Sequence, residues 1–346
     1  MIQFHAEVKL KGELIMNEWI AIVSYSTDLH AEHVLKSLVS QGAKPVLLDL
    51  GEYPEGIQIS VGLNSEAHTS VSFEVRGEIL HGEDLKSVWW RRPLGAYQDE
   101  CVDLQRRYIA SEGEAITRSL SDLLPAAHWI SDPDATRVAG RKPKQLALAA
   151  NLGFRVPDSL VSNSAIAIEK FLDRNGDRPI ILKAVNSAFI RLNPKARDDE
   201  GVNRVVYTKL VQPDFIRLHL SNIAVCPFIV QEAIFKTEDI RVTVVGDEVF
   251  AMGIRTKMKI GDELVVDWRK MDADRDYFRH ELPDAVADLC RKITQELGLK
   301  FGCIDLAYSE DNGYTFFEIN PQGQWLTSEV LLKFPITAAL TALLLS

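Results

Sequence analysis

The sequence predicts an α/β fold for the first part of the chain and an α+β arrangement for its C-terminal part. The first observation is a βαβ unit, in which apolar strands at residues 19–25 and 45–49 enclose a helix that Asp28 can cap and Gly42 ends. The second is that strand-like runs dominate from about residue 200 onward. The third is the absence of repeats and low-complexity tracts, which favours ordinary compact domains.

The remaining elements follow from the same patterns. Residues 57–75 alternate as strands do, residues 87–93 predict a strand that ends at Pro93, and a helix is expected from about residue 98 to 120. No GxGxxG turn follows the first strand, so we expect a Rossmann-like layer without a dinucleotide. Further helices are expected at residues 144–152, 164–175 and 283–297, and strands at residues 179–184, 202–210, 223–234, 240–245, 249–254, 301–309 and 314–319, before a terminal apolar helix.

Length and composition set the number of domains and exclude some classes of protein. The 346 residues suffice for two or three domains. We expect an N-terminal extension at residues 1–15, a first domain at residues 16–124, a central domain at residues 125–230 and a C-terminal domain at residues 231–346. A net charge of −10 argues against a general nucleic-acid binder, because no overall positive field would attract phosphates. Since the sequence has no apolar run of about 18 residues and no signal-peptide pattern, a cytoplasmic protein without a membrane span is expected.

Three polar side chains near the C-terminus suggest a magnesium site. Glu318 and Asn320 are two residues apart on an expected strand, so both point to one face, and Asp305 lies on the strand just before it. Three hard oxygen ligands would then converge, as Mg²⁺ requires, with open positions for phosphate oxygens and water. Taken alone, these residues could equally form the polar, solvated face of a hairpin.

Two lysines are candidates for binding a nucleotide phosphate. Lys183 closes the apolar strand at residues 180–182, where a charge is costly unless it has a partner such as phosphate. Lys142 stands before the helix expected to begin at Lys144, near a helix N-terminus that attracts anions. The alternatives are a strand-end lysine that extends its amine into solvent and, for Lys142, a solvated basic run at residues 141–144.

A third candidate segment joins two expected strands. It consists of Gln231, Glu232, Ala233 and Ile234, and it continues to Asp239 and Arg241. Backbone N–H and C=O groups of such a hinge can pair with an adenine edge, and the Asp239 carboxylate could bind ribose hydroxyls. Arg241 lies on the same face and could hold an anion through two hydrogen bonds. Taken alone, the segment is more typical of an exposed, salt-bridged loop.

In this order and spacing, the three groups of residues resemble the ATP-grasp superfamily, which includes D-alanine–D-alanine ligase and the glutamate ligases that act on ribosomal protein. The resemblance covers roughly residues 125–346. It implies that Lys142 and Lys183 bind the phosphates of ATP, that residues 231–234 receive adenine and that Asp239 takes the ribose. It also implies that Mg²⁺ is bound by Asp305, Glu318 and Asn320.

Within that superfamily, the sequence is similar to the ATP-grasp peptide maturases that cyclise microviridin-type precursors, the graspetide synthetases. The similar segments are residues 88–93 (VWWRRP), 206–208 (VYT), 239–246 (DIRVTVVG), 267–269 (DWR) and 320–326 (NPQGQWL). The resemblance implies a pre-ATP-grasp domain ahead of the ATP-grasp fold, a ribosomally made precursor peptide as substrate, and a homodimer.

Two departures from the superfamily pattern bear on catalysis. Residues 186–201, where many members have a glycine-rich loop over the phosphates, contain one glycine and several charges. Some members have an arginine two residues before the first metal ligand, whereas this position is Cys303 here. We therefore expect other arginines to neutralise the transferred phosphoryl group, and Arg241, Arg269 and Arg255 are the candidates.

The resemblance also implies a reaction. ATP would phosphorylate an Asp or Glu side chain of the peptide, and a Ser/Thr hydroxyl or Lys amine would then attack, giving an ester or amide, ADP and phosphate. A ligase that joins small free carboxylates to amines would use the same residues and stays an alternative. A nucleotide-binding partner protein without activity is less favoured, because the metal ligands and both lysines are present.

Overall fold

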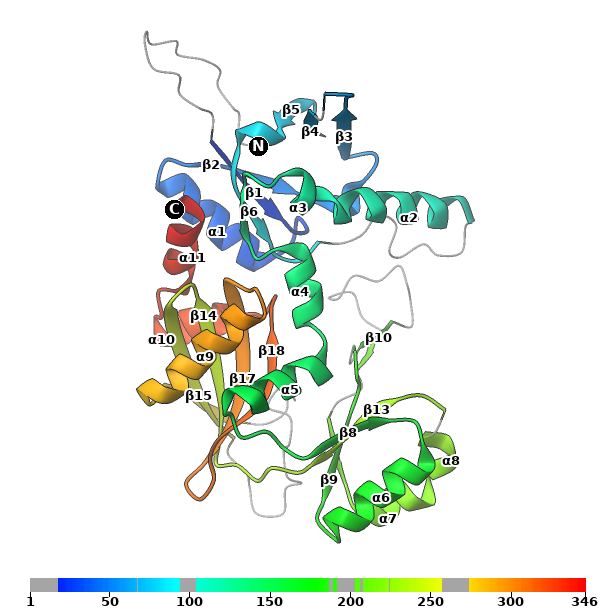
Figure 1. Ribbon diagram of the computed structural model, residues 1–346. Helices are drawn as coiled ribbons and strands as arrows, with labels where there is room; N and C mark the ends of the chain where they lie inside the picture. Colours follow the sequence, from blue (N-terminus) through cyan, green and yellow to red (C-terminus); the bar gives the residue numbers. More distant parts are fainter. Residues whose placement is uncertain are drawn as a thin grey trace.

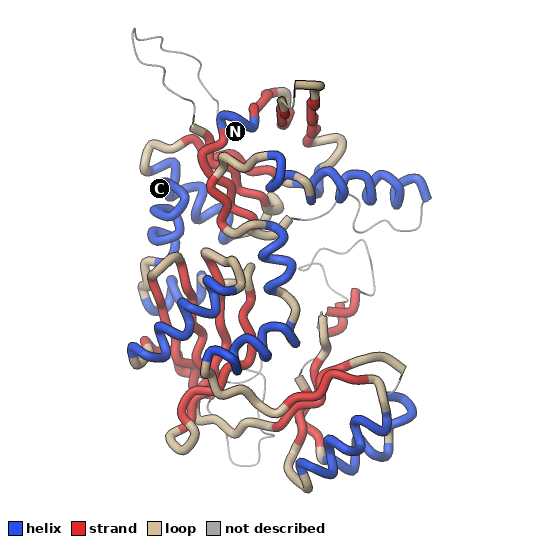
Figure 2. The backbone as a smooth tube through the Cα atoms, in the orientation of Figure 1, coloured by secondary structure: helices blue, strands red, loops and turns tan. Residues whose placement is uncertain are grey.

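The computed structural model describes residues 18–66, 68–93, 104–186, 189–191, 203–205, 208–223, 225–256 and 274–346. The chain forms three domains: the first lies above the C-terminal domain, and the central domain lies to one side (Figure 1). Two helices, α4 (Pro133–Ala139) and α5 (Lys142–Leu152), lead from the first domain past the C-terminal sheet to the central domain. The tube in Figure 2 shows that extended segments make the connections between the central and C-terminal domains.

The first domain contains a parallel four-stranded sheet in the order β2-β1-β6-β7, which confirms the βαβ prediction. Asp28 caps the first helix by accepting a hydrogen bond from the amide of His30. A three-stranded antiparallel sheet, β3-β4-β5, is inserted after β2. The elements are β1 (Trp19–Val23), α1 (Leu29–Ser40), β2 (Lys44–Leu48), η1 (Leu50–Glu52), β3 (Ile57–Leu63), β4 (Thr69–Val75), β5 (Glu78–His81), η2 (Gly82–Asp84), β6 (Leu85–Trp90), α2 (Leu104–Arg118), α3 (Leu120–Leu123) and β7 (His128–Ile130).

The central domain is an antiparallel sheet in the order β12-β9-β13-β8, covered by helices on one face. Its core contains Ile168, Leu172, Ile180 and Val230, all fully buried. The elements are β8 (Ser159–Ser162), α6 (Ala165–Asn175), β9 (Ile180–Lys183), β12 (Lys209–Val211), α7 (Pro213–Leu218), α8 (Leu220–Ile223) and β13 (Phe228–Glu232), with β10 (Phe189–Arg191) paired to β11 (Asn203–Val205) as a separate ribbon.

The C-terminal domain is an antiparallel sheet in the order β16-β15-β14-β17-β18. Its apolar face, which includes Ile240, Val242 and Ile304, packs with residues of α5 and α9 into one core. The hairpin between β14 and β15 turns at Gly246, whose φ of 56° suits glycine. The elements are β14 (Glu238–Val245), β15 (Glu248–Thr256), β16 (Arg275–Arg279), α9 (Asp284–Glu296), β17 (Phe301–Ser309), β18 (Gly313–Asn320), α10 (Leu326–Leu332) and α11 (Ile336–Leu345).

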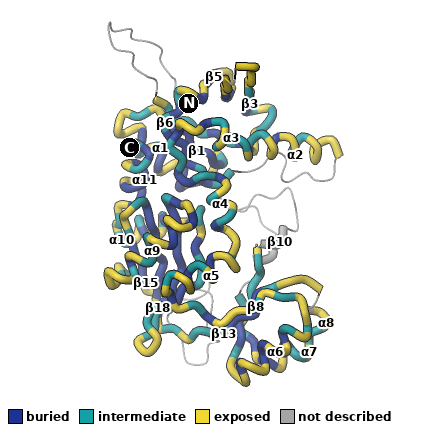
Figure 3. Tube along the Cα trace, in the orientation of Figure 1, coloured by how far each residue is buried: buried dark blue, intermediate teal, exposed yellow. Residues whose placement is uncertain are grey.

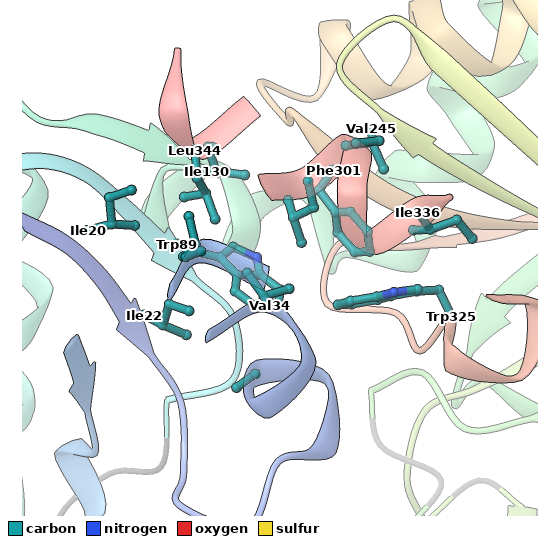
Figure 4. Close-up of a cluster of buried hydrophobic side chains, with 14 of the residues drawn as sticks. Ile20, Ile22, Val34, Trp89, Ile130, Val245, Phe301, Trp325, Ile336 and Leu344 are labelled. Atoms are coloured by element: carbon teal, nitrogen blue, oxygen red, sulfur yellow. The ribbon is translucent and has the colours of Figure 1, made fainter. Parts of the chain in front are cut away.

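The first and C-terminal domains share a hydrophobic core. Trp325, which precedes α10, lies 5.7 Å from Trp89 of β6 and 5.3 Å from Phe301 of β17, measured between ring centroids (Figure 4). Leu340 of α11 and Val34 of α1 belong to the same cluster. Figure 3 shows buried residues in both sheets and a largely exposed α2. The chain end thus returns to the first domain and fastens it to the C-terminal sheet.

Most predicted elements are confirmed, with a few differences in their limits. The strand expected at residues 223–234 is wrong at its start, because β13 begins only after Pro227, which cannot donate a ladder hydrogen bond. The strand expected at residues 202–210 is two strands, β11 and β12, with different partners. Helix α5 begins at Lys142 and not at Lys144, since Pro143 is well suited to a first turn. None of the described helices combines the length and apolar character needed to cross a membrane.

Candidate active site

The three residues predicted to bind magnesium lie on the last two strands of the C-terminal sheet. Asp305 of β17 is directly opposite Glu318 of β18, and Asn320 follows two residues later on the same face. A register shift between Asp305 and Leu306 leaves Phe317 as an extra residue, so that Glu318 takes the place opposite Asp305. Two carboxylates and an amide oxygen are hard donors of the kind that Mg²⁺ prefers, so this set fits the ion.

The three predicted metal ligands differ in their exposure to solvent. Asp305 is buried, Glu318 is partly buried and Asn320 is exposed. The Asn320 side-chain oxygen accepts a hydrogen bond from the amide of Gln322 at 2.9 Å. Within the described ranges, no group of three or more His, Cys, Asp or Glu side chains could hold a metal ion. A metal here would therefore depend on Asn320 and on oxygens from phosphate or water to complete its coordination.

Helix α5 fixes the backbone between the two ligands of β18. The buried Gln145 side chain donates to the carbonyl of Ile319 at 2.8 Å and accepts from its amide at 3.0 Å. Since β18 is the outer strand of the sheet, Gln145 supplies partners that a further strand would have given. Gln145 was not among the residues predicted from the sequence, where its signal was a polar residue one helical turn after Lys142.

The two predicted phosphate lysines approach the metal ligands from α5 and from the central domain. Lys142 Nζ lies 3.6 Å from Oε2 of Glu318 and donates to the carbonyl of the residue after Lys183 at 3.2 Å. Lys183 Nζ lies 5.2 Å from the ring centroid of Phe317. Lys236, which the sequence analysis did not single out as a ligand, lies 5.3 Å from the same ring. All three lysines therefore lie close to Glu318 or to the residue before it.

Arg241 and Asp305 form a buried ion pair beside these ligands. They are opposite each other in the β14–β17 register, and Arg241 Nη1 donates to Oδ1 of Asp305 at 2.8 Å. Burial disfavours the charge on Arg241, but nearby acidic groups, with Asp305 first among them and Glu318 adding to it, together hold the pKa of Arg241 above its usual range. Asp239 is on the same face, and its carboxylate pairs with Lys236. Arg241, Asp305 and Glu318 thus form one row across three strands.

The hinge predicted to receive adenine lies where β13 ends. The amides of Glu232 and Ala233 donate to carbonyls of neighbouring segments, at 2.8 and 3.3 Å. The buried Gln231 side chain donates to the Ser159 hydroxyl at 2.7 Å, which ties β13 to β8. Two of the backbone donors predicted to bind adenine are therefore engaged in hydrogen bonds within the protein. We therefore expect the amide of Ile234 and the hinge carbonyls to bind the adenine edge.

The three predicted catalytic arginines have different positions. Arg241 belongs to the row described above. Arg255 faces the opposite side of the sheet, because it follows the residue that pairs with Asp239. There it pairs with Glu238 and lies 5.1 Å from the ring centroid of Phe278, so the structure does not bring it to the metal ligands. Arg269 lies outside the described residues.

Two family models match the sequence. The model of the MvdD pre-ATP grasp domain matches residues 19–137, and the model of the RimK-like ATP-grasp domain matches residues 139–344. The second match alone extends over more than half of the chain. A comparison with curated protein sequences found no match.

Solved structures share the fold over nearly the whole chain. The macrocyclase MdnC bound with precursor peptide MdnA, from Microcystis aeruginosa MRC, has 23% identity and a TM-score of 0.79, covering 94% of this chain and 99% of that chain. A RiPP-associated ATP-grasp ligase from Chryseobacterium gregarium, in complex with ADP and a leader and core peptide, has 23% identity and a TM-score of 0.79, covering 94% and 96%. The ATP-grasp ligase PsnB, complexed with minimal precursor, Mg and ADP, has 21% identity and a TM-score of 0.70, covering 97% and 100%. At these identities the similarity establishes the fold.

Proposed function

This chain belongs to the RimK-like ATP-grasp family of ligases, and on that premise we propose that it uses ATP and Mg²⁺ to close ester or amide cross-links in a ribosomally made precursor peptide. The observation that carries the proposal is the row of Arg241, Asp305 and Glu318 with Lys142 beside it. Two carboxylates lie there between two cations, so ligands for a metal ion and partners for nucleotide phosphates are close together. Support for a peptide substrate comes from the three similar structures, each of which contains a precursor or a leader and core peptide.

ATP would bind between the central and C-terminal domains. Lys142 and Lys183 would offset the phosphate charge, and the Asp239 carboxylate would accept hydrogen bonds from the ribose hydroxyls. The hinge at residues 231–234 would bind the adenine edge through backbone groups. Lys236 pairs with Asp239 and lies near Phe317, so it adds a further cation on the nucleotide side.

Asp305, Glu318 and Asn320 would hold the magnesium ion. A bound Mg²⁺ would supply positive charge that offsets the charge of the phosphates during phosphoryl transfer. Gln145 keeps the backbone between Glu318 and Asn320 in place, and Arg241 fixes the side chain of Asp305 through their ion pair. The protein therefore contributes position and charge, and no covalent step on its own side chains is needed.

The proposed reaction has two steps. A carboxylate oxygen of a peptide Asp or Glu attacks the γ-phosphorus while the bond to ADP breaks, which gives an acyl phosphate. A Ser/Thr hydroxyl or Lys amine of the peptide then attacks the acyl carbon, loses its proton and displaces phosphate. Each cross-link consumes one ATP and removes the elements of one water molecule from the peptide. Arg241 is the protein cation that we assign to the charge of the transferred phosphoryl group.

The variant Glu318→Gln tests the metal assignment. With ATP, Mg²⁺ and a candidate precursor peptide that contains Thr and Asp/Glu residues, the parent protein should release ADP and yield a peptide lighter by one water per ring, measured by mass spectrometry. Glu318→Gln should abolish ADP release while its circular dichroism stays unchanged. The matched control is Glu310→Gln, at an exposed position in the turn of the same hairpin. Unchanged turnover of Glu318→Gln would overturn the metal assignment.

The same assay separates the alternative activities. ADP release with free amino acids and amines, but not with the peptide, would favour a ligase for small carboxylates. ATP binding without hydrolysis, even with the cognate peptide, would favour a partner protein without activity.

Assembly and location are proposed from the resemblance and the sequence pattern alone. We propose a homodimer in the cytoplasm. Light scattering of the purified protein would give its molar mass, and a monomer at assay concentrations would contradict the dimer.

A further inference from the structure

The turn at residues 321–326, which connects β18 to α10 and includes the first residue of that helix, is held by residues of the first domain. Arg91, in the segment after β6, donates through Nη1 to the carbonyl of Gln322 and, at 2.8 Å, to the carbonyl of Gly323. Nε2 of His30 accepts the amides of Trp325 and Leu326, at 3.2 and 3.4 Å. Four of the six residues of the turn are therefore bound through their backbone by two side chains of another domain.

Arg91 is buried at a high cost. Its exposed fraction is 1%, its Nε lies 3.3 Å from Oδ2 of Asp28, and its guanidinium lies 5.0 Å from the ring centroid of Trp325. Burial lowers the pKa of Arg91 to about 10, so it still carries its charge at neutral pH. Its Nη2 has no hydrogen-bond partner in the part of the chain that the structure describes. Apolar side chains of similar volume often stabilise such a place as well as or better than an ion pair, so stability alone does not account for Arg91.

Backbone hydrogen bonds of the turn connect Arg91 to the predicted metal ligands. Gln322, whose carbonyl Arg91 holds, donates its amide to the side-chain oxygen of Asn320 at 2.9 Å. Gly323 donates its amide to the carbonyl of Asn320 at 3.2 Å. A Cβ at Gly323 would overlap Cys303 and approach Nη2 of Arg241 to 2.9 Å, so the turn fits closely against the sheet. A shift of the Gln322 and Gly323 carbonyls would therefore move Asn320. It would also push the turn against Arg241, which holds Asp305.

We propose that Arg91 of the first domain is a positioning residue for the magnesium site: by holding the carbonyls of Gln322 and Gly323, it orients Asn320 and keeps Arg241 beside Asp305. The inference rests on the proposed function, because it takes Asn320 and Asp305 as metal ligands. It gives the first domain a direct part in a site that lies on the C-terminal sheet.

Binding of Mn²⁺ to the full-length protein tests this role. Mn²⁺ replaces Mg²⁺ as the probe, and its binding is measured by electron paramagnetic resonance with a non-hydrolysable ATP analogue present. Arg91→Met should weaken Mn²⁺ binding by at least about tenfold, while the affinity for the analogue without metal changes by less than about twofold. Arg91→Lys, which keeps the charge and one donor group, should recover part of the loss. The matched control is Lys86→Met, which removes a cation from β6 at a position that pairs with Glu18.

The outcomes separate this inference from the proposed function. Binding of Mn²⁺ to folded Arg91→Met with the parent affinity would overturn the positioning role and leave the metal site standing. An equal loss of analogue binding with and without metal would overturn it as well, because that is the result of a general structural defect. A parent protein that binds no Mn²⁺ with the analogue would overturn the metal site itself. If Arg91→Met does not fold, Arg91→Lys and Asp28→Asn carry the same comparison, since both weaken the hold on the turn without emptying the buried space.

Discussion

At the scale of single residues, Arg241 gives a direct test of the charge arrangement. It is a buried cation beside a predicted metal ligand, with its Nη1 2.8 Å from Asp305. Arg241→Met removes a preorganised cation from the place where charge develops during phosphoryl transfer. We expect kcat for ADP formation to fall by about 10²–10³-fold, with a smaller change in KM for ATP. Steady-state kinetics of ADP release measures both constants.

Arg255 provides the matched control for this prediction. It is an arginine of the neighbouring strand that faces the opposite side of the sheet and pairs with Glu238. Arg255→Met removes the same charge without touching the metal ligands, so kcat should stay within about threefold of the parent value. Equal losses in Arg241→Met and Arg255→Met would contradict the assignment of the phosphoryl charge to Arg241.

His30 should make stability depend on pH. Burial lowers the pKa of His30, an effect that the hydrogen bond with Asp28 opposes in part and that the charge of Arg91 adds to. Its folded pKa therefore lies below the unfolded value of about 6.5. Below that pH the unfolded chain binds more protons than the folded one, so the free energy of unfolding decreases as pH falls toward the folded pKa. The loss from this one group is at most about 1.4 kcal/mol per pH unit.

The variant His30→Gln isolates this contribution. The glutamine oxygen can accept an amide of the turn but does not titrate. We expect the decrease in the free energy of unfolding between about pH 7.5 and 5.5 to be smaller in His30→Gln than in the parent, measured by urea denaturation. The pKa values of His128 and His280 are also lowered by burial, but both residues are present in the two proteins and cancel in the difference. Identical pH dependence in both proteins would exclude His30 as the titrating group.

At the scale of elements, the contact between α5 and β18 determines how firmly the metal ligands are held. Gln145→Leu leaves the amide and carbonyl of Ile319 buried without their partner, which costs roughly 2–5 kcal/mol of stability. Since Ile319 lies between Glu318 and Asn320, the Mg²⁺ concentration needed for half-maximal activity should also rise. Thermal unfolding and a Mg²⁺ titration of ADP release measure the two effects. The control is Lys144→Leu, an exposed position of the same helix, where neither value should change.

Elements with a strong apolar pattern could be predicted from the sequence, whereas contacts between distant segments could not. The β-branched and apolar residues of β14 and β17 and the cap of α1 at Asp28 identified those elements directly. The short helices α7 and α8 lie in a region with weak periodicity and were not predicted, and the strand expected from residue 223 begins only at Phe228. The alternation of side chains along a strand predicted that Glu318 and Asn320 lie on the same face of the sheet. The side on which Arg255 lies depends on the pairing of β14 with β15, which charge alone does not reveal.

In the candidate site, too, contacts between distant segments could not be predicted from the sequence. Asp305, Glu318, Lys142 and Lys183 were identified by their order along the chain, and the structure places them near one another. The hold of Arg91 on the turn after Asn320 joins residues more than 200 positions apart, so no local pattern could reveal it. The roles of all these side chains stay predictions, as do the domain limits at residues 124 and 230.

At the scale of the whole molecule, the first and C-terminal domains are expected to unfold as one unit. Their shared core combines Ile22 and Trp89 from the first sheet with Phe301 and Trp325 from the C-terminal domain (Figure 4). Helix α11 completes it from the chain end, with Leu340 fully buried. Because a hydrophobic core transmits the loss of packing to all the elements around it, a defect in α11 should affect both sheets.

Leu340→Ala tests this coupling between the two domains. The removal of a fully buried leucine side chain should lower the free energy of unfolding by about 2–5 kcal/mol. Amide hydrogen exchange measured by mass spectrometry should accelerate in β1 and in β17 together, because their protection depends on one core. The control is Leu331→Ala in α10, whose leucine is 52% exposed, and its effect should stay within about 0.5 kcal/mol. Acceleration confined to the C-terminal sheet would show that the first domain is stable without the packing of Leu340. It would also argue against a hold on Arg91 that is firm enough to position the turn.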